Sequence, residues 1–256
     1  MNDSSSKILG TFLFLILISC IIYLFFFANQ KTNKGVIQMI EISGNHLLPV
    51  NEYFTFANLE DNTKFANLTL REIKLRFENH PYVEKVDVEY DGDNVVKVYL
   101  IEKNIEAVIL SSGEPNFISD KFQILPILPG VKFMDLPIIS NSQYDNEIKL
   151  LAFLGAKDII EAFKIIESAK LTNEKIFKKL SEINLRKGGD IILTFSGIKP
   201  PVLFGKGEAP RKMVYLDIMW SKISDGSNLV DNSDYIDLRF SDEIFIGTNT
   251  KTGLAE

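Results

Sequence analysis

Residues 83–103, which read VEKVDVEYDGDNVVKVYLIEK, decide the fold of the amino-terminal half of this chain. Apolar and polar side chains alternate along Val83–Tyr90 and again along Val95–Lys103, and the tetrapeptide Asp91-Gly92-Asp93-Asn94 separates the two stretches. Alternation with a period of two is typical of a strand with one buried face. Asp, Gly and Asn tolerate the positive φ angles of a tight turn, so the segment predicts a β-hairpin.

The residues upstream of the hairpin complete a small unit. Val36–Ile42 predicts a strand that ends at a glycine-containing turn, and a short helix fits Asn51–Leu59. A second helix is expected to begin at Thr69, because Thr69 and Glu72 have the spacing of a capping box. Residues 35–103 therefore predict the order β-α-α-β-β, in which two helices cover one face of a small sheet.

Residues 104–247 predict a second, β-rich unit with flanking helices, which places the whole chain in the α+β class. A polar tail, 248–256, follows it. The expected strands are Asn116–Ile124, Asp135–Ser140, Leu180–Leu185, Asp190–Phe195, Val202–Phe204 and Tyr235–Ile246, and the expected helices are Asp145–Lys170 and Arg211–Ile223.

Residues 8–28 predict a single transmembrane helix after a short amino terminus, 1–7. No charged residue occurs in this stretch, and only Gly10, Thr11 and Ser19 fall outside the apolar and aromatic set. A helix of about 20 residues spans the roughly 30 Å hydrocarbon layer of a bilayer. The rest of the chain contains no second apolar run of this length.

A cleaved signal would be an alternative to this anchor. Phe25-Phe26-Phe27 stands where a signal peptide would have small residues before its cleavage site. Leu17-Ile18-Ser19-Cys20 resembles a lipoprotein cleavage box, but Ile21–Phe27 continues the apolar run instead of forming a polar tether. We therefore expect an uncleaved anchor. Its orientation stays open on charge alone, because Lys7 on one side nearly balances Lys31 and Lys34 on the other.

The composition argues against several classes of function. The net charge of −6 is unlike that of proteins that bind nucleic acid through its phosphates. The single cysteine, Cys20, and the two histidines, His46 and His80, leave little material for a metal centre or a catalytic triad. We expect no catalytic residue, no metal, no cofactor and no small-molecule substrate. His80 precedes a proline at a helix end, where a protonated imidazole would interact favourably with the helix dipole.

The stretch Tyr235–Phe240, YIDLRF, suggests a final strand at a sheet edge. Its alternation would place Ile236, Leu238 and Phe240 on one face, and Asp237 could pair with Arg239 on the other. Such an edge offers unpaired N–H and C=O groups that a strand from a partner could complete. An ordinary closing strand with a harmless tail explains the same pattern.

The chain as a whole resembles the bacterial cell-division family FtsQ, also called DivIB. Four pieces carry the resemblance: Ile40-Glu41-Ile42-Ser43-Gly44-Asn45, Phe77-Glu78-Asn79-His80-Pro81-Tyr82-Val83, Val98-Tyr99-Leu100-Ile101-Glu102-Lys103 and Tyr235-Ile236-Asp237-Leu238-Arg239-Phe240. They resemble the family's first strand and turn, its helix exit, the strand that ends its POTRA unit, and its final strand. The last piece is the most specific, and the order of all four after a lone anchor follows the family.

The resemblance implies a non-enzymatic scaffold of the divisome in the cytoplasmic (inner) membrane, at the division septum. The amino terminus would be cytoplasmic and the large part periplasmic or extracytoplasmic, so that the protein links early cytoplasmic division proteins to late septal cell-wall synthesis proteins. A POTRA unit, 35–103, would serve recruitment, and a β domain, 104–247, would bind FtsB-like and FtsL-like bitopic proteins. The implied partner-binding residues are Tyr235, Arg239, Phe240, Asp242, Ile244, Phe245, Ile246 and Thr248.

Two rival interpretations remain. A membrane-anchored extracytoplasmic enzyme of cell-wall metabolism would require a pocket with convergent carboxylates. A component of outer-membrane protein assembly would usually carry several POTRA units and a carboxy-terminal barrel, whereas this sequence predicts one such unit and no long series of strands.

Overall fold

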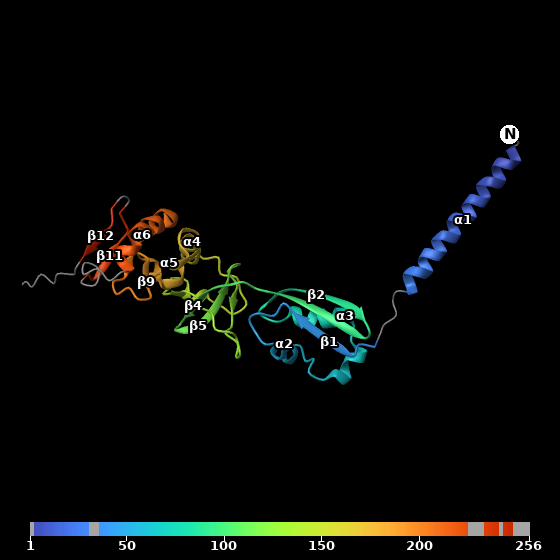
Figure 1. Ribbon diagram of the computed structural model, residues 1–256, viewed down its shortest axis with the longest axis horizontal. Coiled ribbons are helices and arrows are strands. Elements are labelled where there is room, and N and C mark those ends of the chain that lie inside the picture. Colours follow the sequence, from blue (N-terminus) through green and yellow to red (C-terminus); the bar gives the residue numbers. More distant parts are fainter. Residues whose placement is uncertain (1–2, 31–35, 225–232, 241–242, 248–256) are drawn as a thin grey trace, which may run out of the picture.

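The computed structural model describes residues 3–30, 36–224, 233–240 and 243–247, and it has the predicted mixed α+β character. Two sheets follow one another along the chain, and helices accompany both of them (Figure 1). The division between the sheets falls in the short segment that joins Glu102 to Ile105. The limits of the predicted domains stay a prediction.

The first sheet has three strands in the order β1-β3-β2, with β1 parallel and β2 antiparallel to β3. Buried side chains of the helices and of the strands form one apolar cluster in this unit. The elements in chain order are β1 (Met39–Ser43), α2 (Val50–Phe56), the 3-10 helix η1 (Asn62–Asn67), α3 (Leu70–Glu78), β2 (Val83–Gly92) and β3 (Val95–Glu102). The predicted order β-α-α-β-β is therefore present, with an additional 3-10 helix.

Local signals in the sequence set the boundaries of these elements. The Thr69 hydroxyl accepts the Glu72 N–H at 3.2 Å, and the Glu72 carboxylate accepts the Thr69 N–H at 2.7 Å, so the capping box is confirmed. Gly44 ends β1 at φ +83°, and a Cβ at this position would lie 2.1 Å from the Leu100 carbonyl oxygen. Only glycine satisfies both the backbone angle and the close approach.

Glu102, at the end of β3, fixes the turn that follows β1. Its carboxylate accepts the backbone N–H of His46 at 2.7 Å and that of Leu47 at 2.9 Å, together with the hydroxyl of the buried Tyr53. Burial raises the pKa of Tyr53, and the hydrogen bond to Glu102 raises it further. A carboxylate that accepts several N–H and O–H groups makes charge-assisted bonds, so this residue joins the loop, α2 and the sheet.

His80 is structural, but it is not the protonated imidazole that the helix-dipole argument requires. Its side chain is buried, and burial followed by the charge of Lys103 lowers its pKa to about 4. The Nδ1 atom accepts the backbone N–H of Tyr82 at 3.1 Å, which requires an unprotonated nitrogen. The imidazole also packs against Tyr53 and Phe56, each with its ring centroid 4.6 Å away. The loss of hydration outweighs the helix dipole here.

The second sheet has nine strands in the order β12-β11-β10-β9-β8-β7-β4-β5-β6. Its strands are β4 (Ile105–Ser111), β5 (Glu114–Ser119), β6 (Ile124–Leu125), β7 (Ile138–Ser140), β8 (Leu180–Asn184), β9 (Ile192–Phe195), β10 (Val202–Leu203), β11 (Tyr235–Asp237) and β12 (Phe245–Gly247). The accompanying helices are α4 (Lys157–Thr172), α5 (Glu174–Lys179) and α6 (Ala209–Ser224), with 3-10 helices η2 (Asp145–Glu147) and η3 (Arg186–Gly188). Aliphatic residues of α4 and α6 and of the strands form one buried cluster.

Two predicted strands of the second unit were wrong in detail, and a third strand was missed. Strand β4 was not predicted, because side chains on both of its faces are buried and no alternation results. The predicted strand Asn116–Ile124 is interrupted between β5 and β6, where Phe122 adopts φ +63°. The predicted strand Tyr235–Ile246 is two strands, β11 and β12, which pair with each other in antiparallel fashion.

The predicted helix Asp145–Lys170 begins only at Lys157. The segment before it pairs with β6 instead, since the Ile124 N–H donates to the Ala152 carbonyl at 2.9 Å and the Leu151 N–H donates to the Ile124 carbonyl at 2.8 Å. These bonds satisfy the backbone of a short strand that would otherwise lie at the sheet edge. Tertiary pairing therefore overrides the apolar spacing in this segment.

The apolar core of the first sheet continues into the second. Phe117 of β5 and Leu125 of β6 are buried in the same cluster as Tyr82. The Tyr82 hydroxyl donates to the Pro126 carbonyl at 2.8 Å and accepts the Leu128 N–H at 2.9 Å. One buried aromatic side chain thus connects the two units through both packing and hydrogen bonds.

Upstream of both sheets, α1 (Asp3–Gln30) covers the stretch for which a membrane span is predicted. Within the described residues, no helix combines the length and the apolar character that crossing a membrane requires. The predicted span, 8–28, includes residues 8, 9 and 26–28, whose side chains lie outside the described part of the chain. The membrane anchor therefore stays a prediction.

Candidate functional site

The hairpin of β11 and β12 ends the large sheet. In its register Tyr235 lies opposite Gly247, Ile236 opposite Ile246 and Asp237 opposite Phe245. The outer strand, β12, has β11 as its one neighbour in the described sheet. Figure 1 shows this hairpin at the end of the molecule that is farthest from α1.

The hydrogen bonds of β11 determine which backbone groups of β12 face outward. The Ile236 N–H donates to the Pro201 carbonyl at 3.0 Å and the Leu238 N–H to the Leu203 carbonyl at 2.9 Å, so these residues face β10. Asp237, which lies between them, and Tyr235, which precedes them, therefore face β12. Because neighbouring residues of a strand point their backbone groups in opposite directions, Ile246 directs its N–H and C=O toward the open edge.

Apolar side chains accompany this edge. Phe240 is 52% exposed and Phe245 is 44% exposed, and the two rings meet edge to face with their centroids 4.9 Å apart. Ile244 and Ile246 are partly buried against the core of the second unit. The hairpin thus presents an exposed aromatic pair beside unpaired backbone groups. Ile244 and Ile246 fix it to the core of the second unit.

Arg239, which follows β11, stabilises the start of the connection between β11 and β12 through ion pairs. Its guanidinium contacts both oxygens of Asp237, at 2.9 Å from Nε and 2.6 Å from Nη2, which confirms the predicted pair. A further nitrogen, Nη1, lies 2.9 Å from Asp190, a residue 49 positions earlier. Burial raises the pKa of Asp237, but the bonds from Arg239 outweigh this and hold the pKa below its usual range. The same bonds raise the pKa of Arg239.

The ring of Tyr235 depends on a glycine across the hairpin. A Cβ at Gly247 would lie 2.4 Å from the Cζ atom and the hydroxyl of Tyr235. A larger residue at 247 would therefore displace this half-buried ring. Sequence reasoning missed both Gly247 and Asp190, because each matters only through a partner that folding brings to it.

The structure brings most of the predicted binding residues into this one hairpin: Tyr235, Arg239, Phe240, Ile244, Phe245 and Ile246. Asp242 and Thr248 lie outside the described residues. The predicted facial alternation was wrong in one respect, because Ile236 and Leu238 are buried whereas Phe240 is exposed. Phe240 lies beyond the end of β11, so it no longer follows the alternation of that strand. That these residues bind a partner stays a prediction.

The described part of the chain offers no cluster of metal-ligating side chains. Over these residues, no group of three His, Cys, Asp or Glu side chains is placed to hold a metal ion. The Asp158 carboxylate accepts the Ser142 hydroxyl at 2.7 Å and the Gln143 N–H at 3.0 Å, and the neighbouring Glu161 lies 2.9 Å from Lys164. These carboxylates serve structural contacts.

Comparison with known proteins gives one relationship that covers nearly the whole chain. A cell division protein FtsQ from Geotalea daltonii is 23% identical over 243 residues, which cover 94% of this chain and 86% of that protein. No protein-family model matches the sequence. The similarity supports a distant FtsQ-like relationship and suggests a role in cell division.

Proposed function

We propose that this protein is a scaffold of the cell-division machinery that acts by protein–protein interaction and not by catalysis. The relationship to an FtsQ over 94% of the chain supports the division role. The observation that carries the proposal is the open edge of β12, which combines outward backbone groups with the exposed pair Phe240 and Phe245. Exposed apolar surface beside an unpaired strand is typical of a protein-binding site.

The partner binds by adding a strand to β12. Its main chain pairs with the outward N–H and C=O of Ile246, and its apolar side chains cover Phe240 and Phe245. By the family resemblance, this partner is an FtsB-like bitopic protein with an FtsL-like protein alongside. Main-chain pairing provides the binding geometry, and the aromatic pair provides most of the buried apolar area.

The first unit has a separate role in this proposal. Its order of elements and its three-stranded sheet suit a POTRA-type unit, 35–103, which recruits the protein to the septum through other divisome proteins. The continuous core around Tyr82 supports a fixed arrangement of this unit relative to the β-rich unit, 104–247. A partner bound at β12 is then held at a defined distance from the recruiting unit.

We also propose that the predicted span, 8–28, which lies in α1, anchors the protein in the cytoplasmic membrane at the septum, with a cytoplasmic amino terminus and both sheets on the outer side. Large apolar side chains from Phe12 to Phe25 are exposed along this helix. Such a surface is unfavourable in water and suits a lipid environment.

The first experiment localises an amino-terminal fluorescent fusion in dividing cells and isolates its partners from the same strain. A band at mid-cell, with FtsB-like and FtsL-like proteins recovered, is the expected result. An even membrane distribution without such partners would overturn the division role.

A backbone variant tests the edge itself. Ile246→Pro removes the outward N–H, and proline is tolerated on edge strands where that group faces away from the sheet. We expect Ile246→Pro to lose the partner while the fusion stays at mid-cell, because recruitment depends on the first unit. Ile246→Val is the matched control, since it keeps the N–H and should retain the partner.

A further inference from the structure

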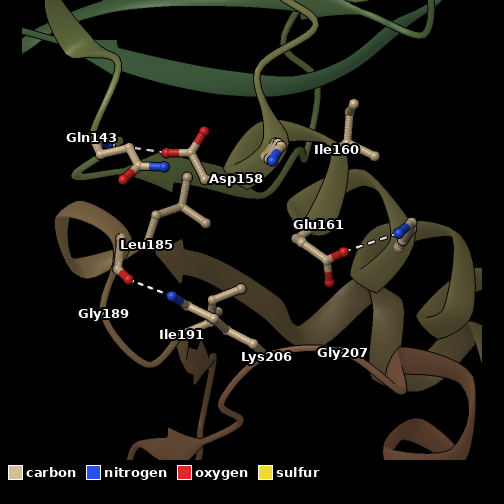
Figure 2. A pocket seen from close by; sticks show the side chains of 12 residues that line it. Gln143, Asp158, Ile160, Glu161, Leu185, Gly189, Ile191, Lys206 and Gly207 are labelled. Atoms are coloured by element: carbon tan, nitrogen blue, oxygen red, sulfur yellow. Dashed lines mark hydrogen bonds and ion pairs between the residues drawn. The ribbon is translucent and has the colours of Figure 1, made fainter.

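A hollow of about 520 Å³ opens in the second unit, next to the segment in which Asp190 pairs with Arg239. Its lining comes from the first turns of α4, the connection between β8 and β9, the loop that follows β10, and Gln143 after β7 (Figure 2). Its volume lies within the range of about 300–1,000 Å³ that is usual for small-molecule sites. None of its lining residues belongs to β11 or β12, so the proposed partner edge does not account for it.

The floor of the hollow is apolar. Leu185 and Ile191 are almost fully buried beneath it, and the half-buried Ile160 of α4 forms an adjacent wall (Figure 2). Branched aliphatic side chains of this kind favour an apolar body over a fully hydrated ion. A ligand of the hollow should therefore carry hydrocarbon.

Ammonium groups mark the rim. Lys206 extends across the hollow, and its Nζ donates to the Gly188 carbonyl (Figure 2). An ammonium group has three N–H donors, so this contact leaves two of them for a ligand. Lys157, the first residue of α4, adds a second ammonium group to the lining.

The carboxylates of the lining are already engaged. Asp158 accepts N–H and O–H groups at both oxygens, from Ser142, Gln143 and its own neighbour Ile159, at 2.7 to 3.0 Å. Glu161 lies beside the ammonium group of Lys164. With three lysines and two acids in the lining, one positive charge is left over. The hollow is therefore complementary to a monoanion.

The backbone around the hollow is held in an unusual conformation. Gly188 adopts φ +85°, and a Cβ there would lie 2.5 Å from the Oε1 atom of Gln143. Arg186 and Lys187, which lie between the lining residues Leu185 and Gly188, have positive φ angles of 47° and 52°, whereas Gly207 adopts its φ of 68° without strain. Residues with a strained backbone conformation are often found at ligand-binding sites. Lys206 and Gly207, in the loop that follows β10, are also part of the lining.

We propose that the hollow binds a small organic carboxylate with a branched apolar body. The carboxylate lies between the ammonium groups of Lys157 and Lys206, and the hydrocarbon covers Leu185 and Ile191. No bond is made or broken in this step. The inference does not depend on the proposed division role, because its lining and its ligand are separate from the β12 edge.

The test is a titration of the isotope-labelled full chain in neutral maltoside micelles, followed by NMR. The probe is 3-methylbutanoate, and 3-methylbutanamide is the control because it has the same shape without the charge. We expect saturable shifts of the Gly188, Gly189 and Gly207 amides with the carboxylate and about tenfold weaker binding of the amide, the factor that one charge-assisted hydrogen bond provides.

Variants give the second readout. Lys206→Met keeps the length of the side chain without its charge and should weaken carboxylate binding about tenfold. Lys199→Met, at an exposed lysine outside the hollow, should leave it unchanged. Equal binding of the amide, shifts that do not saturate, or unaltered affinity of a folded Lys206→Met protein would overturn the proposal. Inorganic phosphate binding as tightly as the probe would overturn the role of the apolar floor.

Discussion

Truncation of Phe240 tests the proposed partner edge most directly. A phenylalanine side chain has about 200 Å² of surface to bury. Since Phe240 is 52% exposed in the free protein, about 100 Å² is available to a partner. At about 25 cal/mol per Å², covering this area contributes about 2.5 kcal/mol, which corresponds to about 60-fold in affinity. Phe240→Ala should therefore raise the Kd for the strand-donating partner by about this factor.

The assay is biolayer interferometry of the full chain in lipid nanodiscs against the FtsB-like protein. Phe133→Ala is the matched control, because Phe133 is 92% exposed and lies in the connection between β6 and β7. The control should keep the Kd of the wild type. Hydrogen exchange at the Phe245 amide, which faces β11, checks that the hairpin is intact. An unchanged Kd for Phe240→Ala with an intact hairpin would refute the reasoning, and so would an equal loss in both variants.

Three further predictions concern stability, measured by urea unfolding of the full chain in detergent. Glu102→Gln should cost about 2 kcal/mol, because the turn after β1 loses charge-assisted bonds, whereas Glu84→Gln in an exposed ion pair should cost less than about 0.5 kcal/mol. Gly44→Ala should cost more than about 2 kcal/mol, whereas Gly113→Ala, which has a similar φ but open space around it, should cost about 1 kcal/mol. The pKa of His80 falls from 6.5 to about 4 on folding. Its contribution to the free energy of unfolding is therefore complete above pH 6.5. It should decrease by about 1.4 kcal/mol per pH unit below that, as far as pH 4. His80→Phe should flatten this slope, and an equal slope in the variant would assign it to other groups.

The sequence predicted those elements whose signals are local. The alternation around Val86 and Val98, the cap at Thr69 and the turn at Gly44 each involve residues within a few positions of one another. For the candidate site, the pair of Asp237 and Arg239 could be predicted for the same reason. Such signals do not depend on how distant parts of the chain meet.

Strand β4 and the beginning of α4 could not be predicted in this way. The segment Ile105–Ser111 is buried by both apolar clusters, which include elements before and after it in the chain, so it lacks the alternation of a strand with one exposed face. The residues before Lys157 have helical apolar spacing, but pairing with β6 gives their backbone a better set of hydrogen bonds. In both segments long-range contacts outweigh local preference.

By itself, the sequence determined the β-α-α-β-β order of the first unit and the turn chemistry of its hairpin. It also determined the position of the last apolar segment, Tyr235–Ile246. Only the tertiary structure decided that this segment folds back on itself, so that β12 and not β11 is the edge and Phe240 is exposed. It also brought Asp190 to Arg239, and Lys157 to Lys206 across a hollow. The physical reason is that alternation and capping act over a few residues, whereas edges, ion pairs and hollows arise where distant segments pack.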